Sequence, residues 1–468
     1  MSSNGPRDRE QNRLSARVGR YARVGANMSG LAAKLAGARV FGMEIDDAKQ
    51  ARELAEALGG LKGPLMKVAQ LLSTIPDAIP PEYAEELAKL QAAAPPMGWA
   101  FVKRRMQAEL GPRWQSRFES FDKEPAAAAS LGQVHRATAL DGTPLACKLQ
   151  YPDMASAVEA DLKQLALLFS LHRRMRPAID TREIAAEISE RVREELDYHR
   201  EARNMAVYRE IFAEEPRIRV PEVDDRLSTK RLLTMGWLEG GPLLAHKDDD
   251  LDTRNHLAEV MFRAWWHPFS HYGVIHGDPH LGNYAVFAED GRPAGINLLD
   301  YGCIRVFPPS FVAGVVDLYR GLLEDDEARI VSAYERWGFQ GLTKDLIEIL
   351  NIWARFIYGP LLSDRVRSIA DGVSPAQYGR KEAFRVHQAL KEKGPVTVPR
   401  EFVFMDRAAV GLGAVLLHLQ AELNFYQIFR AQLEGFSTGA VEARQAAALQ
   451  EVGLESPAAR AEMPPKKA

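Results

Sequence analysis

Two short polar motifs in the second half of the chain contain the residue types that phosphoryl transfer requires. The first is His276-Gly-Asp-Pro-His-Leu-Gly-Asn283, and the second is Asp300-Tyr-Gly302. In phosphoryl transfer, one aspartate orients or deprotonates the attacking hydroxyl group, and an asparagine and a second aspartate hold magnesium on the phosphates. Asp278 is therefore the candidate catalytic residue, and Asn283 and Asp300 are the candidate magnesium ligands. The competing interpretation is a polar turn followed by an ordinary buried aspartate.

Regular elements must hold these side chains at a fixed spacing. Residues 284–287 (Tyr-Ala-Val-Phe) and 296–299 (Ile-Asn-Leu-Leu) are mostly apolar, which predicts two short buried strands between the motifs. The apolar periodicity of residues 252–272 predicts an amphipathic helix that leads into the first motif.

Residues 125–150 predict a second structural unit, which binds the nucleotide. A run of small residues over 125–131 leads into an alternating strand, Asp141-Gly142 indicates a hairpin, and 144–150 is the returning strand that carries Lys148. In kinases a turn of this kind covers the phosphates, and a lysine on the third strand reaches them. The candidate phosphate contacts are Ala127, Ala128, Ala129, Ser130 and Lys148. Alanine stands where common kinases have glycine, so this loop is expected to be stiffer.

Two further segments complete the predicted nucleotide site. Long helices are expected over 154–175 and 182–213, and Glu201 on the second is the candidate partner of Lys148 because an active nucleotide lobe requires such an ion pair. Solvated surface charge is the competing interpretation of Glu201. Residues 236–241 are the predicted hinge, whose backbone would hydrogen-bond adenine, with Met235 and Leu238 as contacts.

Composition limits the class of protein. A length of 468 residues predicts at least two lobes or domains. Sixty basic and 63 acidic side chains give a formal net charge of -3, which disfavours nucleic acid as a partner. Only two cysteines are present, which fits a reducing compartment, and small buried packing residues are the favoured interpretation of both.

The apolar windows are too short to cross a bilayer. The longest of them, 408–418 and 162–171, fall below the roughly 20 residues that a membrane helix needs. The first residues lack the apolar core of a secretory signal. We therefore expect a cytosolic protein that is at most peripheral to a membrane, with the arginine-rich arm before residue 28 as the segment that would contact lipid.

Helices account for most of the remaining chain. Near the start, Lys67 and Gln70 share one face of a helix expected over 61–74, and periodicity alone would make this a solvated face. No long activation segment follows Asp300-Tyr-Gly302. The other expected helices are 28–58, 82–91, 99–110, 311–323, 328–337, 343–358, 376–391 and 402–433.

Taken together, these motifs resemble the AarF-domain, or UbiB, family of atypical kinases. The residues that carry the resemblance are Lys67 to Gln70, Ala126 to Gln133, Lys148, Glu195 to Asp197, Glu201, His276 to Asn283, and Asp300 to Gly302. The resemblance implies an α+β, two-lobed protein-kinase-like fold with a small β-rich N-lobe, a helical C-lobe and an added N-terminal helical extension across the active site. It also implies ATP and Mg²⁺ as cofactors, weak or conditional ATPase activity, and a link to isoprenoid-quinone or other lipid metabolism.

By position, the resemblance makes Lys67 and Gln70 contacts to the nucleotide pocket, with Glu195 and Asp197 as their partners. The expected organisation is an arginine-rich arm (1–27), a helical extension (28–115), an N-lobe (116–239), a C-lobe (240–436) and an Ala-rich tail (437–468). The chain departs from the family pattern at two positions: Ala69 stands where glycine is usual, and Gly236 stands where many relatives have glutamate. In contrast to the quinone-biosynthesis relatives that carry C-terminal membrane helices, we expect none in this sequence.

Three functions are compatible with these features. The first is an atypical kinase or ATPase that acts on a lipid or isoprenoid-type molecule, because no arginine stands between His276 and Asp278 to read a phosphorylated activation loop. The second is a small-molecule kinase of the aminoglycoside or choline type, which also uses His-Gly-Asp. The third is a nucleotide-gated lipid-binding pseudokinase, against which the full set of magnesium ligands argues.

Overall fold

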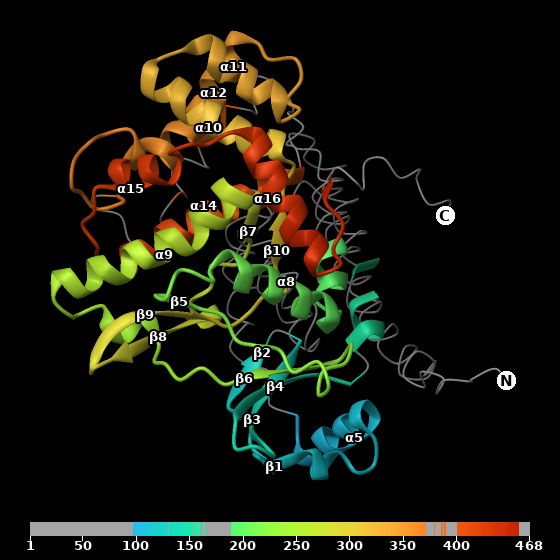
Figure 1. The fold of residues 1–468 in the computed structure, drawn as a ribbon. Helices are drawn as coiled ribbons and strands as arrows, with labels where there is room; N and C mark the ends of the chain where they lie inside the picture. Colours follow the sequence, from blue (N-terminus) through green and yellow to red (C-terminus); the bar gives the residue numbers. More distant parts are fainter. Residues whose placement is uncertain are drawn as a thin grey trace, which may run out of the picture. The chain divides into compact units, whose positions relative to one another are not determined.

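The computed structural model describes residues 97–129, 131–152, 154–159, 162–163, 189–370, 379, 385–386, 388–389 and 400–457 (Figure 1). The chain divides into two compact units. Unit 1 comprises Met1–Met175, Ile184–Tyr198 and Asp224–Met235, and unit 2 comprises Arg176–Glu183, His199–Val223 and Gly236–Ala468. The predicted lysine strand therefore belongs to unit 1, whereas both polar motifs belong to unit 2.

Unit 1 contains a five-stranded sheet with the order β1-β3-β4-β6, in which β2 also pairs with β3. The pairs β1–β3, β2–β3 and β3–β4 are antiparallel. Gly142 has φ +86°, so the turn predicted at Asp141-Gly142 is confirmed. The strands are β1 (Phe118–Phe121), β2 (Ala127–Ala129), β3 (Gly132–Ala139), β4 (Pro144–Gln150) and β6 (Leu232–Gly236).

Helix α5 (Trp99–Leu110) contributes to the core of unit 1. Its Val102, Met106 and Leu110 join Trp114, in the 3-10 turn η3 (Trp114–Arg117), and the inward side chains of the strands in one apolar cluster. These helix positions are three or four residues apart, so they lie on one face and give an apolar stripe against the sheet. Burial of this stripe stabilises the unit that carries Lys148.

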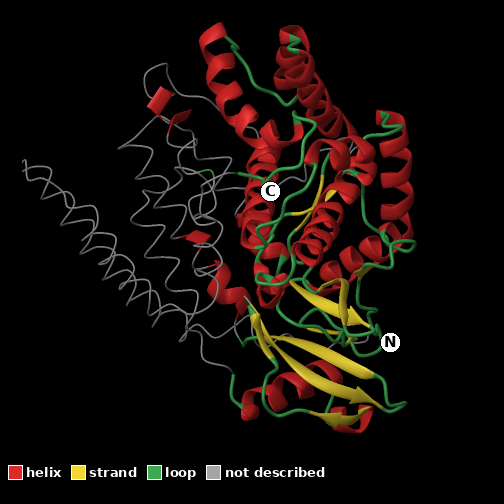
Figure 2. Ribbon diagram, turned by 90° about the vertical axis from the view of Figure 1, so that its left-hand side faces the viewer, coloured by secondary structure: helices red, strands yellow, loops and turns green. Residues whose placement is uncertain are grey.

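Unit 2 is mostly helical and contains two small sheets, as the red and yellow of Figure 2 show. In one sheet β7 (Val274–His276) pairs antiparallel with β10 (Ile304–Val306). In the other, β9 (Arg292–Leu298) lies between β5 (Ile218–Arg219) and β8 (Tyr284–Glu289). The strands expected over 284–287 and 296–299 are thus confirmed as the β8–β9 hairpin.

The helices of unit 2 begin with α8 (Tyr198–Ile211) and α9 (Leu251–Tyr272), and η4 (Leu243–His246) lies between them. Asp250 caps α9, because its side chain accepts a hydrogen bond from the Thr253 N–H group. A short 3-10 turn, η5 (Leu281–Asn283), lies between β7 and β8. The remaining helices are α10 (Pro309–Glu324), α11 (Glu327–Arg336), α12 (Lys344–Tyr358), η6 (Gly359–Leu361), α14 (Arg400–His418), α15 (Phe425–Gln432) and α16 (Thr438–Glu451).

Two of the expected long helices are wrong in their extent. The helix expected over 182–213 is interrupted at Glu195–Asp197, because the Tyr198 N–H group donates to the Lys230 carbonyl instead of continuing the helical ladder. The helix expected over 402–433 is interrupted after His418, where Gln420 has φ +48° and Asn424 caps a separate helix.

The segment from Ser437, expected as an Ala-rich tail, contains helix α16. Ser437 caps this helix by accepting a hydrogen bond from the Ala440 N–H group. The helix packs on α9 and α10, and its Val441 and Leu449 side chains are buried. It is therefore part of the core of unit 2.

Candidate active site

The strands β7 and β10 fix the start of the loop that contains Asp278. His276 pairs with Ile304, and the Gly277 N–H group donates to the Cys303 carbonyl at 2.8 Å. From α9, the Trp265 indole N–H donates to the His276 carbonyl at 3.0 Å. Helix α9 thus precedes the loop in sequence and also stabilises its start through this hydrogen bond.

His276 orders the loop through both nitrogens of its buried ring. Its Nε2 lies 2.7 Å from the Asp300 carbonyl oxygen, and its Nδ1 lies 3.1 Å from the Asp278 amide nitrogen. A carbonyl can only accept and an amide N–H can only donate, so the proton is on Nε2 and the ring is neutral. One imidazole therefore joins the two polar motifs and orders the loop that contains Asp278.

Asn283 holds the other side of Asp278. Its Nδ2 donates to the Asp278 carbonyl at 2.9 Å. Because that carbonyl requires a donor, the amide must turn its Oδ1 atom away, and this acceptor has no partner in the part of the chain that the structure describes. The Leu299 N–H group donates to the Asn283 carbonyl at 2.8 Å, which brings Asn283 and Asp300 to the same end of the β8–β9 hairpin.

The Asp300 turn is anchored to helix α8. The Gly302 N–H group donates to Asp300 Oδ1 at 3.1 Å. The next residue along the turn, Tyr301, donates through its amide to Glu201 Oε1 at 3.4 Å, and Asn204 Nδ2 donates to the Tyr301 carbonyl at 2.9 Å. Glu201 and Asn204 are both buried and lie one helical turn apart on α8. Helix α8 therefore controls the position of Asp300.

Tyr301 fills the space between α8 and the Asp300 turn. Its ring is fully buried and meets the Tyr208 ring edge-to-face, with 5.4 Å between centroids. Burial raises the pKa of Tyr301 well above its usual value, and the nearby Tyr208, Asp300 and Glu201 act in the same direction. Its hydroxyl group is a neutral donor to the Leu298 carbonyl, so it acts as a packing residue.

In unit 1, Lys148 points from β4 into a buried environment. It pairs with Val134 across the sheet, only 6% of its surface is exposed, and its Nζ lies 5.3 Å from the centroid of the Tyr198 ring. A lysine so deeply buried must be held by specific partners, because desolvation of an isolated ammonium group is costly. Tyr198 provides one such contact through its ring face.

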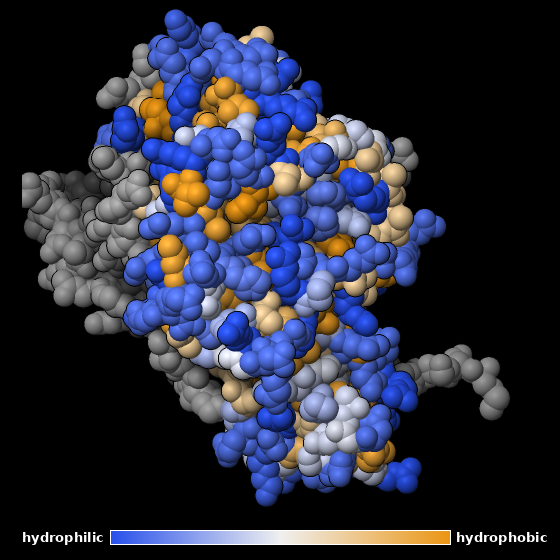
Figure 3. Space-filling view, turned by 60° about the vertical axis from the view of Figure 1, so that its left-hand side comes forward, coloured by the Kyte–Doolittle hydropathy of each residue, from blue (hydrophilic) through white to orange (hydrophobic). Residues whose placement is uncertain are grey.

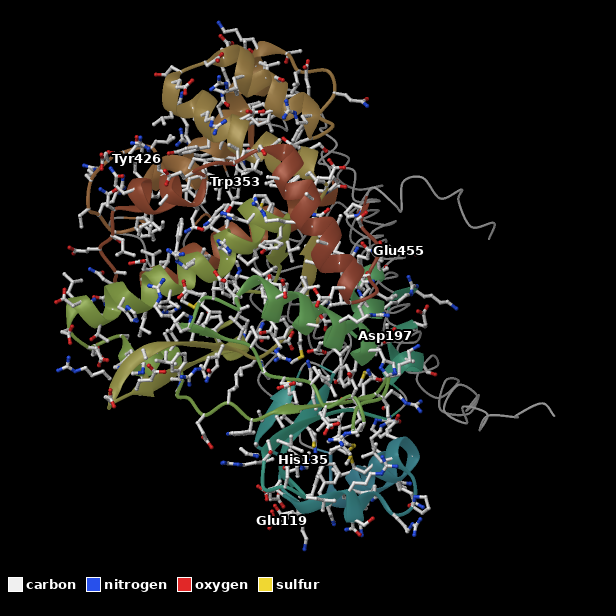
Figure 4. All side chains as sticks on the ribbon, in the orientation of Figure 1. Glu119, His135, Asp197, Trp353, Tyr426 and Glu455 are labelled. Carbon is white, nitrogen blue, oxygen red and sulfur yellow. The ribbon has the colours of Figure 1, made fainter. Side chains whose placement is uncertain are left out.

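Gln150 connects the lysine strand to Glu195 and Asp197. It lies two residues after Lys148 on β4, and its Nε2 donates to the Leu196 carbonyl at 3.1 Å. Leu196 stands between Glu195 and Asp197, in the turn that interrupts the expected helix. Asp197 is labelled in Figure 4. The turn that contains Glu195 and Asp197 is thus attached through the Leu196 carbonyl to the strand that carries Lys148.

The alanine segment differs from the expected turn. Ala127, Ala128 and Ala129 form strand β2 and pair with Val134, Gln133 and Gly132 of β3. Alanine tolerates extended backbone, whereas it disfavours the positive φ that glycine supplies in a flexible turn. Ser130, Lys67 and Gln70 lie outside the described residues.

The predicted hinge starts where unit 1 ends. Met235 is the last residue of unit 1 and is buried at the end of β6, and Leu238 is partly exposed. The Gly236 N–H group donates to the Glu222 carbonyl at 2.8 Å. Further along, the Asn297 Nδ2 group donates to the Glu239 carbonyl, which fixes the end of the hinge on the β8–β9 hairpin.

Comparison with known families identifies this arrangement. The family model for the ABC1 atypical kinase-like domain matches residues 89–334, which is more than half of the chain. The chain belongs to the ABC1 family of atypical kinase-like proteins. The matched region contains the alanine segment, Lys148, Glu201 and both polar motifs. The expected α+β kinase-like fold is confirmed.

Individual ABC1 relatives cover different parts of the chain. An uncharacterised protein from Synechocystis, sll1770, is 30% identical over 84% of this chain and 66% of its own length. The yeast mitochondrial atypical kinase COQ8 is 30% identical over 54% of this chain and 50% of its own length. The chain thus spans about half to two thirds of these relatives. A solved structure, the Rv3197–erythromycin complex from Mycobacterium tuberculosis, matches 84% of this chain and 97% of its own with a TM-score of 0.54 and 28% identity.

The oxygen-rich chemistry of the ABC1 motifs suits a hard cation. Mg²⁺ prefers oxygen ligands and usually takes one or two carboxylates, completing its shell with water and phosphate oxygens. Asn283 Oδ1 and the Asp300 carboxylate are the protein oxygens available at one end of the β8–β9 hairpin, and both residues are partly exposed. Among the described residues, no group of three or more His, Cys, Asp or Glu side chains could hold a metal ion. A magnesium ion at this site would therefore need water and phosphate oxygens as further ligands.

Both cysteines are buried free thiols, so the packing interpretation is confirmed. Burial raises the pKa of Cys147 to about 12, which keeps it a thiol. None of the described helices is long and apolar enough to span a membrane. On the face drawn in Figure 3, apolar side chains occur in small groups among polar ones.

Four residues that position the ABC1 motifs carry no role in the sequence prediction. Asn204 lies three residues after Glu201, and this spacing is the one signal that could have found it. Trp265 sits within a helix whose apolar pattern predicts only burial. Gln150 donates to the Leu196 carbonyl, and the Tyr284 hydroxyl donates to the Pro279 carbonyl. Every residue has a backbone carbonyl, so the sequence does not indicate these partners.

Proposed function

We propose that this ABC1 protein binds Mg-ATP and transfers or hydrolyses the terminal phosphoryl group. In this proposal Lys148 of unit 1 contacts the α and β phosphates and pairs with Glu201, while Asn283 and Asp300 of unit 2 hold the magnesium ion. Asp278 orients the attacking hydroxyl group or water. The observation that carries the proposal is the double constraint on Asp278, whose amide is held by His276 and whose carbonyl is held by Asn283.

Preorganisation explains why this constraint matters. Phosphoryl transfer depends almost entirely on positioning and electrostatic stabilisation. Because its backbone donor and its backbone acceptor are both engaged, Asp278 has a fixed backbone position from which its side chain extends. The amide orientation forced on Asn283 directs an oxygen ligand away from the backbone, as a magnesium ligand requires.

The remaining sites of the proposal surround the nucleotide. Ala127, Ala128, Ala129 and Ser130 cover the phosphates, and Met235 and Leu238 contact the adenine. Glu195 and Asp197 receive Lys67 and Gln70 from the N-terminal extension. Support for Glu195 and Asp197 comes from their attachment to the Lys148 strand through Gln150.

We propose a lipid or isoprenoid-type molecule as the acceptor or regulator, in a protein that is cytosolic or peripheral to a membrane. Support for this comes from the ABC1 relatives and from the missing long activation segment, since β10 and α10 follow Gly302 directly. A soluble metabolite as acceptor and a pseudokinase that binds lipid without transfer are the two alternatives. Because the mycobacterial relative was solved with erythromycin, a macrolide is a further candidate ligand.

One experiment separates these functions. The purified full chain is incubated with ATP labelled at the γ position, Mg²⁺, and in parallel either extracted lipids, a soluble metabolite fraction or erythromycin. Labelled lipid, labelled metabolite and labelled macrolide each identify the acceptor, and free phosphate alone identifies an ATPase. Nucleotide binding without any turnover supports the pseudokinase and contradicts the enzymatic proposal. An Asp278→Asn variant is the control for contaminating ATPases.

A further inference from the structure

The loop that contains Asp278 rests directly on helix α14. Gly411 of α14 faces Pro279, the residue that follows Asp278. A methyl carbon built on Gly411 would overlap Pro279 Cγ and would lie 3.3 Å from both Cβ and Cδ of the same ring. The helix backbone and the proline ring are therefore in van der Waals contact with no room for a side chain. Helix α14 also contacts β7, which leads into the loop.

This contact is rigid on both sides. A proline ring has no rotatable side chain that could move away, and Gly411 lies within a helix of 19 residues. Because carbon atoms pack at about 3.5 to 4.0 Å, relief of the overlap would require the loop or the helix to move by roughly 1 Å or more. The movement would act on the residue next to Asp278.

The carbonyl group of Pro279 is also held. The Tyr284 hydroxyl donates to the Pro279 carbonyl at 3.3 Å, and burial raises the pKa of Tyr284, so the hydroxyl stays a neutral donor. Pro279 therefore contacts Gly411 through its ring and Tyr284 through its carbonyl. The loop cannot retreat from an enlarged residue 411 without the loss of this hydrogen bond.

Helix α14 is itself anchored beyond its C-terminal end to the helix that supports the loop. Arg254 of α9 donates to the carbonyls of Leu419 and Gln420, and Asn255 of α9 accepts from the Glu422 N–H group. Helix α9 also holds the loop through Trp265. The loop is thus bounded by two helices that are joined to each other.

We propose that Gly411 is a positioning residue for Asp278, and that the packing of α14 against Pro279 fixes the position of the loop that contains Asp278. Helix α14 lies outside residues 89–334, the region that the ABC1 family model covers. The catalytic consequence rests on the proposed function, whereas the positional consequence does not.

The test compares Gly411→Ala with two matched variants in the full chain. Gly439→Ala is the control, because Gly439 also lies in a helix and an added methyl group there meets no atom within 4 Å. Pro279→Ala is the compensating change, since it removes the ring atoms that the new methyl group would strike. The double variant Gly411→Ala/Pro279→Ala should therefore recover what Gly411→Ala loses.

Two readouts are measured on each folded variant. Amide hydrogen exchange should rise in the 276–284 segment of Gly411→Ala and should return toward the wild-type rate in the double variant. The kcat for Mg-ATP turnover should fall by roughly 100-fold in Gly411→Ala, because a displacement of about 1 Å can cost this much. The KM for ATP should change far less, since Lys148 and the hinge are untouched.

Unchanged exchange in a folded Gly411→Ala protein, or a double variant no closer to the wild type than Gly411→Ala, would overturn the inference. If Gly411→Ala does not fold, recovery of folding in the double variant Gly411→Ala/Pro279→Ala supports the contact, and a double variant that also fails to fold contradicts it. A wild-type protein without ATP turnover would contradict the proposed function. Amide hydrogen exchange does not depend on turnover, so it would still test whether Gly411 positions the loop.

Discussion

The Asn283 side chain donates a hydrogen bond to the Asp278 carbonyl at 2.9 Å, and this bond decides the direction of the remaining amide oxygen. One side chain thereby serves two functions that a sequence motif cannot separate. Its nitrogen fixes the loop, and its oxygen becomes a ligand for a cation. The spacing of Asp278 and Asn283 is explained by this bond together with the 3-10 turn η5 between them.

Asn283→Asp tests this division of labour. The substitution keeps an oxygen ligand but replaces the donor with a carboxylate that faces the Asp278 carbonyl, so we expect a loss of about 1 to 3 kcal/mol in the free energy of unfolding. Urea denaturation without nucleotide measures this cost. Asn283→Ala should lose less stability but should abolish the Mg²⁺-dependent part of nucleotide binding. Equal stability of the Asp variant and the wild type would show that the bond contributes nothing.

Glu109 joins helix α5 to the sheet of unit 1, and its removal should be costly. Its carboxylate contacts Arg105 at 3.3 Å and Arg231 at 2.9 Å, and it accepts from the Thr229 hydroxyl at 2.7 Å. Glu109→Ala leaves buried guanidinium groups without their carboxylate, for which we expect about 3 to 5 kcal/mol of destabilisation. Chemical denaturation measures the change.

The control for Glu109 is an exposed ion pair in the same unit. Glu159 lies 2.6 Å from Arg193, and both side chains are about half exposed, at 48% and 51%. Surface pairs contribute about 0 to 1 kcal/mol, so Glu159→Ala should have little effect. Similar costs for the two substitutions would contradict the account of the buried network.

Acid should destabilise unit 2 through two neighbouring histidines on α9. His267 and His271 have ring centroids 4.2 Å apart. Burial, followed by the proximity of His271, lowers the pKa of His267 to about 4, and burial, followed by Arg444, lowers the pKa of His271. Between pH 6.5 and about 4 the unfolded chain therefore binds more protons than the folded chain, so the free energy of unfolding falls as the pH falls through this window.

The measurement is the denaturation midpoint as a function of pH for the wild type and for His267→Gln. The variant cannot titrate at this position, so its midpoint should fall less steeply between pH 6.5 and 4. Equal slopes would show that His267 titrates normally in the folded protein.

Gln445 of α16 stabilises one end of the β7–β10 pair, where the chain enters β7 and leaves β10. Its Nε2 donates to the Tyr272 carbonyl at 2.8 Å and to the Phe307 carbonyl at 2.9 Å, and the residue is only 2% exposed. Gln445→Ala leaves two buried acceptors without this donor, which should cost about 1 to 3 kcal/mol. Gln450→Ala, an exposed position on the same helix, is the control and should change stability by less than about 0.5 kcal/mol.

Local patterns predicted the parts of the fold that local forces determine. Short apolar runs predicted β8 and β9, and Asp141-Gly142 predicted its turn, because each of these features depends on residues that are neighbours in sequence. The break before Tyr198 could not be predicted, since helical periodicity continues through it and the bond that ends the ladder goes to Lys230. For the same reason, the division between α14 and α15 could not be predicted from the sequence.

The candidate site shows the same limit. The motif spacing predicted which residues carry the chemistry, and within unit 2 the structure brings Asp278, Asn283, Asp300 and Glu201 into one hydrogen-bonded group. The supports of that group could not be predicted. Gly411 and Gln445 act through shape and through backbone carbonyls of segments far away in sequence.

The most direct test of the account is Mg²⁺-dependent stabilisation by nucleotide, measured as the shift in melting temperature with ATP in the presence and absence of Mg²⁺. The wild type should show a shift that requires both, Asp300→Asn should lose the Mg²⁺-dependent part, and Asp290→Asn, in the exposed turn at the opposite end of the same hairpin, should retain it. A full Mg²⁺-dependent shift in Asp300→Asn would contradict the assignment of this site to metal-bound nucleotide.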